Sequence, residues 1–194
     1  QEIHLATVID SSVAPERRRV MLDIMQAFVK DKGANVRKEE QRRTAGNMRM
    51  HRSYRKWVLH VWELNGPPDS WTAQLESYYR GQPVFALVGG LGQASWKPVH
   101  AFSERFEVPV VFPQIDVPVV QGDNHYNLYL TRGVSLQAEV LAGFIKEQGE
   151  VKRVLQVYRT DDAGLAASAT LRAALPPDVV LQDVVLTGPA DDAF

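Results

Sequence analysis

The sequence predicts an α/β fold: a parallel sheet with helices on both faces, followed by the start of a second α/β lobe. Two observations support this prediction. Short apolar runs alternate with amphipathic stretches of helical length along most of the 194 residues, which is the pattern of β-α-β units. The run at 84–88 also leads into Gly89-Gly90-Leu91-Gly92, and a glycine-rich turn after a buried strand is typical of the functional edge of such a sheet.

Seven apolar runs have the length of strands and are bounded by turn residues. They predict strands at 3–9, 57–64, 84–88, 108–112, 128–131, 154–158 and 179–186. Because helical stretches separate most of these runs, we expect parallel strands with right-handed crossovers. The loops that follow the strands should then lie at one edge of the sheet, where function is expected.

The helices follow from apolar periodicity and from their end signals. The first should begin at Pro15 and end at Gly33, with Val20, Ile24 and Phe28 forming a stripe buried in the core. Another should begin at Ser95, directly after the glycine-rich turn. The remaining helical patterns lie at 71–78, 136–145 and 161–174.

The polar passage at 121–132 has no periodicity and is the expected boundary between two lobes, 1–130 and 131–194. Only two strands and two helices are predicted after it, so the second lobe is expected to be incomplete. Between Asp31 and Lys56 nine Lys and Arg stand against three Asp and Glu, a net charge of +6 in a chain whose total is −1. We interpret residues 34–55 as an exposed basic insertion whose possible partner is an acidic protein. Nucleic acid is not expected, because the insertion has a single aromatic residue, Tyr54, for stacking.

Composition excludes several classes of function. No apolar run approaches the roughly 18 residues of a membrane span. The chain has no Cys, so thiol catalysis and thiolate metal sites are excluded, and the five His show no ligand spacing. No nucleophile or P-loop motif is present, so we expect no enzyme activity, no cofactor and no metal. The chain begins with Gln1, for which we favour removal of a signal peptide over another boundary.

The glycine-rich turn is the first candidate site. Gly90 and Gly92 let backbone N–H groups approach a ligand, and a helix beginning at Ser95 would favour an anion such as a carboxylate. Trp96 is expected either in the core or as a pocket wall. The alternative for the whole turn is a capped connection that binds nothing.

Gln114 and Asp116 follow the neighbouring predicted strand, so they should face this turn across a crevice. A carboxylate opposite a donor-rich turn suits a zwitterion, whose ammonium group would lie at Asp116. The turn also approaches a dinucleotide fingerprint, but Ser95 replaces the third glycine and Trp96 crowds the turn. A nucleotide-dependent enzyme is therefore the third and least favoured hypothesis.

The order of elements and the short patterns GGLGQAS, VPVVFP, LYLTRG and VKRVLQVYRTDDAGLAASATLRAAL resemble type I periplasmic solute-binding proteins of ABC importers, especially binders of branched-chain amino acids and amides. The resemblance implies two lobes that close on a ligand, and a family chain that continues beyond residue 194. It implies that lobe one holds the carboxylate of an amino acid and that Arg132 lies at the hinge. The implied ligand-binding residues are Gly90, Gly92, Ala94, Ser95, Trp96, Gln114, Asp116 and Arg132.

Two departures from the family pattern concern the ligand. Gln114, Ile115 and Asp116 replace small residues after the fourth strand, and Ala163 stands where an aromatic residue often precedes glycine. The leading hypothesis is a non-catalytic, periplasmic or secreted protein that captures a small polar solute, an amino acid or a related carboxylate or amide. It would deliver this solute to an ABC permease, its only link to a membrane. The alternative is a binding-protein-like sensory or partner-docking module that uses the basic insertion.

Overall fold

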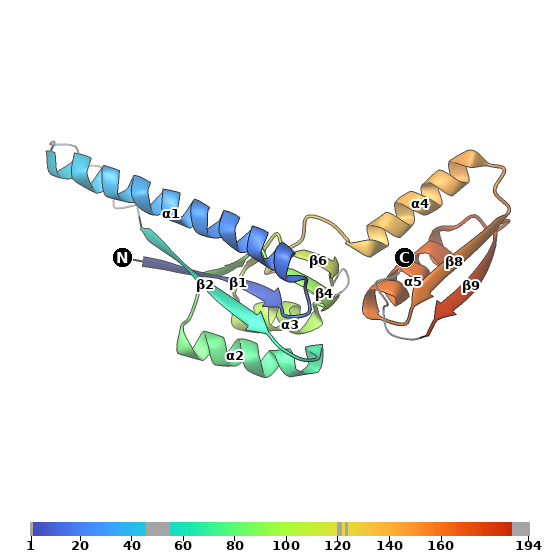
Figure 1. The fold of residues 1–194 in the computed structure, drawn as a ribbon, viewed down its shortest axis with the longest axis horizontal. Helices are drawn as coiled ribbons and strands as arrows, with labels where there is room; N and C mark the ends of the chain where they lie inside the picture. Colours follow the sequence, from blue (N-terminus) through green and yellow to red (C-terminus); the bar gives the residue numbers. More distant parts are fainter. Residues whose placement is uncertain (1, 46–54, 120–121, 123, 188–194) are drawn as a thin grey trace.

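The computed structural model describes residues 2–45, 55–119, 122 and 124–187, and for residues 35–45 it describes the backbone only. The described chain forms two lobes (Figure 1). The first lobe contains a seven-stranded sheet and the second a two-stranded sheet. The chain passes between them through residues 129–133.

All strand pairs of the first lobe are parallel, as the sequence predicts. The strands are β1 (Glu2–Asp10), β2 (Lys56–Leu64), β3 (Ala86–Val88), β4 (Leu91–Ser95), β5 (Val110–Val111), β6 (Gln114–Val117) and β7 (Asn127–Leu128). The sheet runs β6-β4-β1-β3-β5-β7, and β2 pairs with the other edge of β1. Both β3 and β4 pair with the same edge of β1, so β4 continues the path of β3 along the sheet.

The glycine-rich segment corrects one prediction. The sequence predicted a turn into a helix at Ser95, but the chain continues as β4 through Ser95, and α3 (Lys97–Phe106) begins two residues later. Gly89 and Gly90 have φ of 65° and 130°, so they form a kink between β3 and β4 that other residues rarely allow. The kink lets the strand resume its pairing with β1, and Pro98 then suits the first turn of α3.

Helices lie on both faces of the first sheet. The helix α1 (Pro15–Ala45) crosses one face, and α2 (Trp71–Gly81) and α3 lie on the other, with the short 3-10 helix Pro68–Ser70 leading into α2 (Figure 1). The main core lies between the sheet and α2 and α3. Its largest fully buried side chains include Trp71, Trp96 and Leu75. A smaller cluster beneath α1 contains Ile9 and Leu91, with Met21 packed against it.

Two predictions about α1 are wrong. Val20, Ile24 and Phe28 are not core residues, because 56%, 64% and 56% of their surfaces are exposed. The helix also does not end at Gly33 but continues to Ala45, since a glycine inside a helix costs only about 1 kcal/mol. The partly buried residues Met21, Leu22 and Met25 lie on a neighbouring face of α1, and that face packs toward the sheet, so the predicted stripe is not the covered face. Of the predicted insertion at 34–55, residues 34–45 continue α1 and 46–54 lie outside the described residues.

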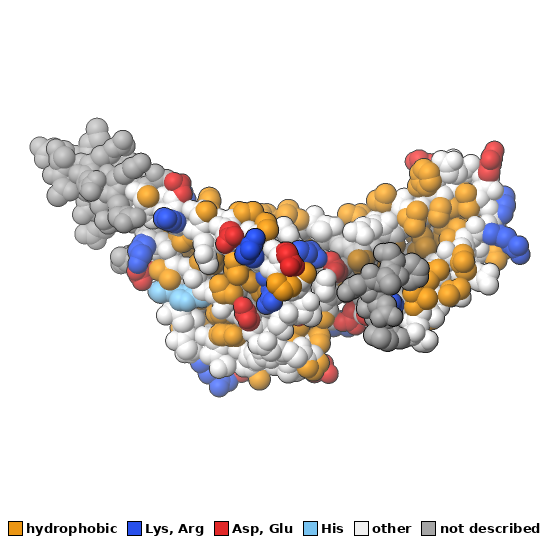
Figure 2. Space-filling model, viewed as in Figure 1, with side chains coloured by type: hydrophobic (Ala, Val, Ile, Leu, Met, Phe, Trp, Pro, Cys, Tyr) orange, Lys and Arg blue, Asp and Glu red, His pale blue; other side chains and the backbone are white. Residues whose placement is uncertain are grey.

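The second lobe consists of α4 (Val134–Gln148), β8 (Arg153–Arg159), α5 (Asp162–Ala174) and β9 (Val180–Leu186). Its two strands are parallel, and Ala138 and Ala142 of α4 pack against Leu171 of α5. Leu155 and Val157 alternate with the buried Gln156 and are mostly exposed, so this side of the sheet carries no helix of the described chain. Figure 2 shows hydrophobic side chains gathered over this lobe. Among the described helices of the chain, none is long and apolar enough to cross a membrane.

Candidate functional site

The candidate site lies where the carboxyl ends of β4 and β6 meet the second lobe. In this region α5 contacts both strands, and α4 contacts β6. The carboxyl edge of the first sheet is thus opposite the beginning of α5, as Figure 1 shows. Most of the residues that the sequence singled out lie at this junction, but they do not all have surfaces that a ligand can reach.

Gly90, Gly92 and Trp96 belong to the core. A Cβ on Gly92 would lie 2.6 Å from Cζ3 of Trp96, and one on Gly90 would lie 3.4 Å from the same indole. The Trp96 side chain is fully buried and packs edge-on against Trp71, so it is not the pocket wall that the sequence allowed. Ala94 packs against the same core. These four predicted residues therefore belong to the packing that supports the site.

Ser95 supplies a backbone donor to the junction. Its N–H donates to Oδ2 of Asp162 over 2.8 Å, and this hydrogen bond joins β4 to the first turn of α5. Ser95 does not begin a helix, so the predicted helix end for an anion is absent at this residue. The N–H is nevertheless directed at a carboxylate, and that carboxylate belongs to the second lobe.

Asp162 is a residue of this site that sequence reasoning placed at the start of the predicted helix 161–174 and did not assign to a site. In the structure Asp161 caps this helix, because its carboxylate accepts a hydrogen bond from Gly164 N over 2.7 Å. Asp162 occupies the first turn of α5, where the partial positive charge of the helix end favours a carboxylate. The available signal was the pair of Asp residues directly after β8, because a segment after a parallel strand lies at the carboxyl edge of its sheet.

Gln114 and Asp116 lie within β6 and not in a loop after the preceding strand. Gln114 N donates to Gly90 O over 2.9 Å, and its exposed side chain borders a cavity of about 360 Å³ beneath α1. The half-buried Asp116 alternates with the buried Ile115, so its carboxylate faces the opposite side of the sheet from the main core. This carboxylate has no hydrogen bond or ion pair with another described residue.

The segment between the lobes is held by Gly133. Its φ is 59°, and a Cβ here would collide with the carbonyl oxygen of Asp116. Thr131 Oγ1 accepts a hydrogen bond from Gly133 N over 3.2 Å. The predicted hinge residue Arg132 is half-exposed and forms an ion pair with Glu139 of α4. Arg132 is therefore bound to the second lobe.

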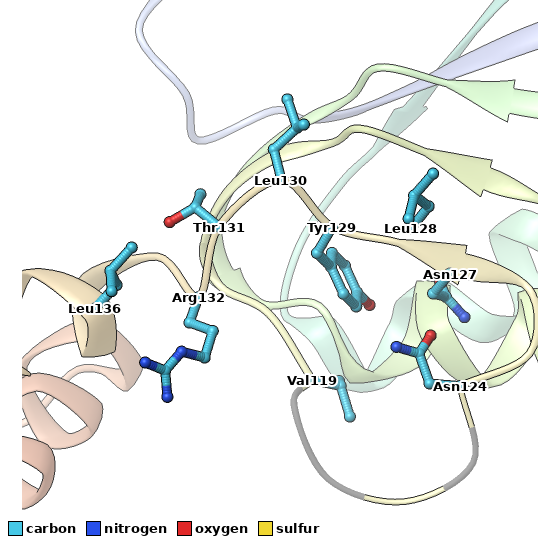
Figure 3. Close-up of a pocket in the computed structure, with 9 residues that line it drawn as sticks. All are labelled: Val119, Asn124, Asn127, Leu128, Tyr129, Leu130, Thr131, Arg132 and Leu136. Carbon is cyan, nitrogen blue, oxygen red and sulfur yellow. The ribbon is translucent and has the colours of Figure 1, made fainter.

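A cavity of about 410 Å³ opens beside this segment (Figure 3). Tyr129 points toward Asn124 and Asn127, whereas Arg132 extends toward the second lobe. The Tyr129 hydroxyl is 2.9 Å from Nδ1 of His100, with which it shares a hydrogen bond. Burial raises the pKa of the Tyr129 phenol; a backbone hydrogen bond at Val119 lowers this pKa, and the charge of Glu104 raises it again, so the pKa stays well above its usual value. The phenol is therefore a neutral hydrogen-bonding group, and sequence reasoning did not identify this cavity.

Glu104 anchors the chain that leads into this cavity. Its carboxylate accepts hydrogen bonds from His125 N, Tyr126 N and Asn127 Nδ2, the last over 2.8 Å. Desolvation raises the pKa of Glu104, but the hydrogen bonds from Tyr126, Asn127 and His125 outweigh it and hold the pKa below 4.5. The ionised carboxylate thus fixes the beginning of β7 on α3.

The junction can bind a small polar molecule through a backbone donor, carboxylates and amides. Within the described ranges, no three His, Asp or Glu side chains are arranged to hold a metal ion. The backbone donor, carboxylates and amides at the junction favour recognition through hydrogen bonds and charge.

Comparison with known proteins adds to this geometry. No protein-family model and no curated protein matches the sequence. Among solved structures, a substrate-binding protein of an ABC transporter from Desulfitobacterium hafniense, in complex with Leu, has a TM-score of 0.63 and 12% identity. The match covers 97% of this chain and 52% of that chain.

Two further solved structures are similar in fold to the chain and are also longer than it. The branched-chain amino acid transporter substrate binding protein LivJ from Streptococcus pneumoniae, in complex with isoleucine, has a TM-score of 0.57 and 17% identity over 100% of this chain and 52% of that chain. A solute binding protein of an ABC transporter from Rhodopseudomonas palustris, in complex with 3,4-dihydroxy benzoic acid, has a TM-score of 0.57 and 10% identity, over 95% and 46%. The chain spans about half the length of these proteins, and it has the fold of the type I substrate-binding proteins of ABC transporters.

Proposed function

We propose that the protein is a non-catalytic solute-binding protein that captures a small polar metabolite between its two lobes. The lobes correspond to residues 1–130 and 131–194, and the solute is an amino acid or a related carboxylate or amide. The observation that carries the proposal is the meeting of the carboxyl ends of β4 and β6 with the start of α5. Parallel sheets bind ligands at this edge.

The individual roles follow from the side chains at the junction. Ser95 N–H is a donor for a carboxylate, and the carboxylate of Asp116, which is unpaired among the described residues, can accept a hydrogen bond from an ammonium group. Gln114 adds an exposed amide at the cavity beneath α1, and Arg132 lies where the chain crosses between the lobes. Gly90, Gly92, Ala94 and Trp96 support the strand that presents Ser95. The family fold favours an ABC permease as partner and a periplasmic or secreted location.

A thermal-shift screen of metabolites tests the proposal. A solute present at 100 times its Kd stabilises the folded protein by about 2.7 kcal/mol, a shift in Tm of a few degrees. We expect at least one amino acid, amide or carboxylate to produce such a shift. A flat response to all three classes would contradict the proposed function.

The substitution Asp116→Asn tests whether the solute binds at Asp116. This change removes the carboxylate that faces the ammonium group, so the solute should bind about tenfold more weakly or worse. Asp23→Asn is the matched control, because Asp23 is an exposed residue of α1 away from the junction. Equal loss of affinity in both variants would show that Asp116 acts only through net charge.

A further inference from the structure

A carboxylate of the protein itself occupies the donor that the proposed function assigns to the solute. Asp162 Oδ2 lies 2.8 Å from Ser95 N, although 67 residues separate the two in the sequence. The two groups belong to different lobes, so the hydrogen bond exists only while α5 stays close to the end of β4.

The local structure keeps Asp162 in this place. Asp161 caps α5 through Gly164 N, which fixes the direction in which the first turn leaves the cap. A Cβ on Gly164 would collide with the carbonyl oxygen of Arg159, so the path from β8 into α5 is tightly constrained. Asp162 is therefore presented to the first lobe by a rigid helix start.

We infer that Asp162 is a built-in competitor of the solute carboxylate: it latches the two lobes through Ser95 N–H, and a solute that carries a carboxylate must displace it. This inference rests on the proposed function, because it concerns the same donor. A bare backbone N–H has room for one strong acceptor along its N–H direction, so the two carboxylates exclude each other.

The latch lowers the apparent affinity only for solutes that use Ser95 N–H. The apparent Kd equals the intrinsic Kd divided by the fraction of molecules in which the donor is free. A solute without an acceptor for Ser95 N–H, such as the amine that lacks the carboxyl group, does not compete with Asp162. The latch thus adjusts the threshold concentration at which acids are captured.

Three variants separate the acceptor from the charge. Asp162→Ala removes both, Asp162→Asn keeps a neutral acceptor, and Asp161→Asn removes a neighbouring charge while Asn still caps the helix. Titration calorimetry on the full chain should compare each amino acid that responds in the thermal-shift screen with the corresponding amine that lacks the carboxyl group. Hydrogen exchange of the Ser95 amide, followed without solute, reports on the latch directly.

We expect Asp162→Ala to bind amino acids about 3- to 10-fold more tightly, with a smaller gain for Asp162→Asn and little change for the amines or for Asp161→Asn. The Ser95 amide should exchange faster in Asp162→Ala. Weaker binding of amino acids by Asp162→Ala would make Asp162 part of the solute site and overturn the inference. Unchanged exchange at Ser95 would also overturn it. If no amino acid responds in the screen, the proposed function loses its support, and the exchange measurement alone decides whether the latch exists.

Discussion

The indole of Trp96 occupies space that only a glycine at position 92 leaves open: a Cβ on Gly92 would lie 2.6 Å from Cζ3 of Trp96. The contact explains why position 92 is a glycine. Trp96, the residue that precedes α3, fills with its indole the space in the core that a side chain at position 92 of β4 would occupy.

Gly92→Ala should destabilise the protein by about 1 to 3 kcal/mol, because a fully buried ring must move to admit the methyl group. Urea unfolding measures this change. Gly143→Ala is the control: a Cβ at this position of α4 meets nothing within 4 Å, so alanine should stabilise the helix by about 0.5 to 1 kcal/mol. Equal effects of the two substitutions would contradict the packing of Trp96 on Gly92.

Gly133→Ala should disturb the connection between the lobes more than an ordinary loop substitution. Alanine at a φ of 59° costs about 1 to 2 kcal/mol, and its Cβ would also collide with the Asp116 carbonyl. Gly149→Ala shares the positive φ but has open space around it, so it isolates the first cost. We expect a larger loss of stability at position 133, together with a change in small-angle scattering. Matching losses and scattering profiles would argue against a tight contact.

Glu104 should contribute stability that depends on pH. Because the pKa of Glu104 is lower in the folded protein than its ordinary value of 4.5, its contribution is complete above about pH 4.5 and is lost as the pH falls through the folded-state pKa. Glu104→Gln should therefore cost about 1 to 2 kcal/mol at pH 7, and the difference should shrink in acid. Glu107→Gln, at the exposed end of α3, is the control and should have little effect at either pH. A cost that is constant with pH would rule out a role for the charge.

The apolar stripe on α1 should matter little for the stability of this chain. Ile24 is 64% exposed, so Ile24→Gln should change the free energy of unfolding by no more than about 0.5 kcal/mol. Leu75→Ala, in the fully buried part of α2, should cost about 2 to 5 kcal/mol. Chemical denaturation measures the free energy of unfolding of both variants. A large loss of stability in Ile24→Gln would show that the stripe is covered in solution.

The sequence by itself determined most of the succession of strands and helices and their parallel arrangement, although β4 and β6 were not predicted. Alternating apolar runs and amphipathic stretches depend on local periodicity, which is a property of neighbouring residues. For that reason β1, β2, β8 and β9 lie within one or two residues of their predicted positions. The same pattern predicted a site at the carboxyl edge of the sheet, because parallel topology brings the ends of successive strands to one edge.

Periodicity alone did not show which helix face is covered. The stripe of Val20, Ile24 and Phe28 correctly indicated a helix, but whether such a face is buried depends on what packs against it. The face of α1 that packs toward the sheet carries Met21, Leu22 and Met25, so the side chains of the stripe remain exposed. A pattern within one segment does not show which face its neighbour will cover.

Only the tertiary structure decided how the glycine-rich segment is used. Gly89 and Gly90 are compatible locally with a turn into a helix and with a kinked strand, and the pairing of Leu91 with Ile9 selects the strand. The position of Asp162 at Ser95 likewise depends on a contact between lobes, across 67 residues of sequence. Such contacts depend on the packing of whole elements, so local sequence propensity cannot predict them.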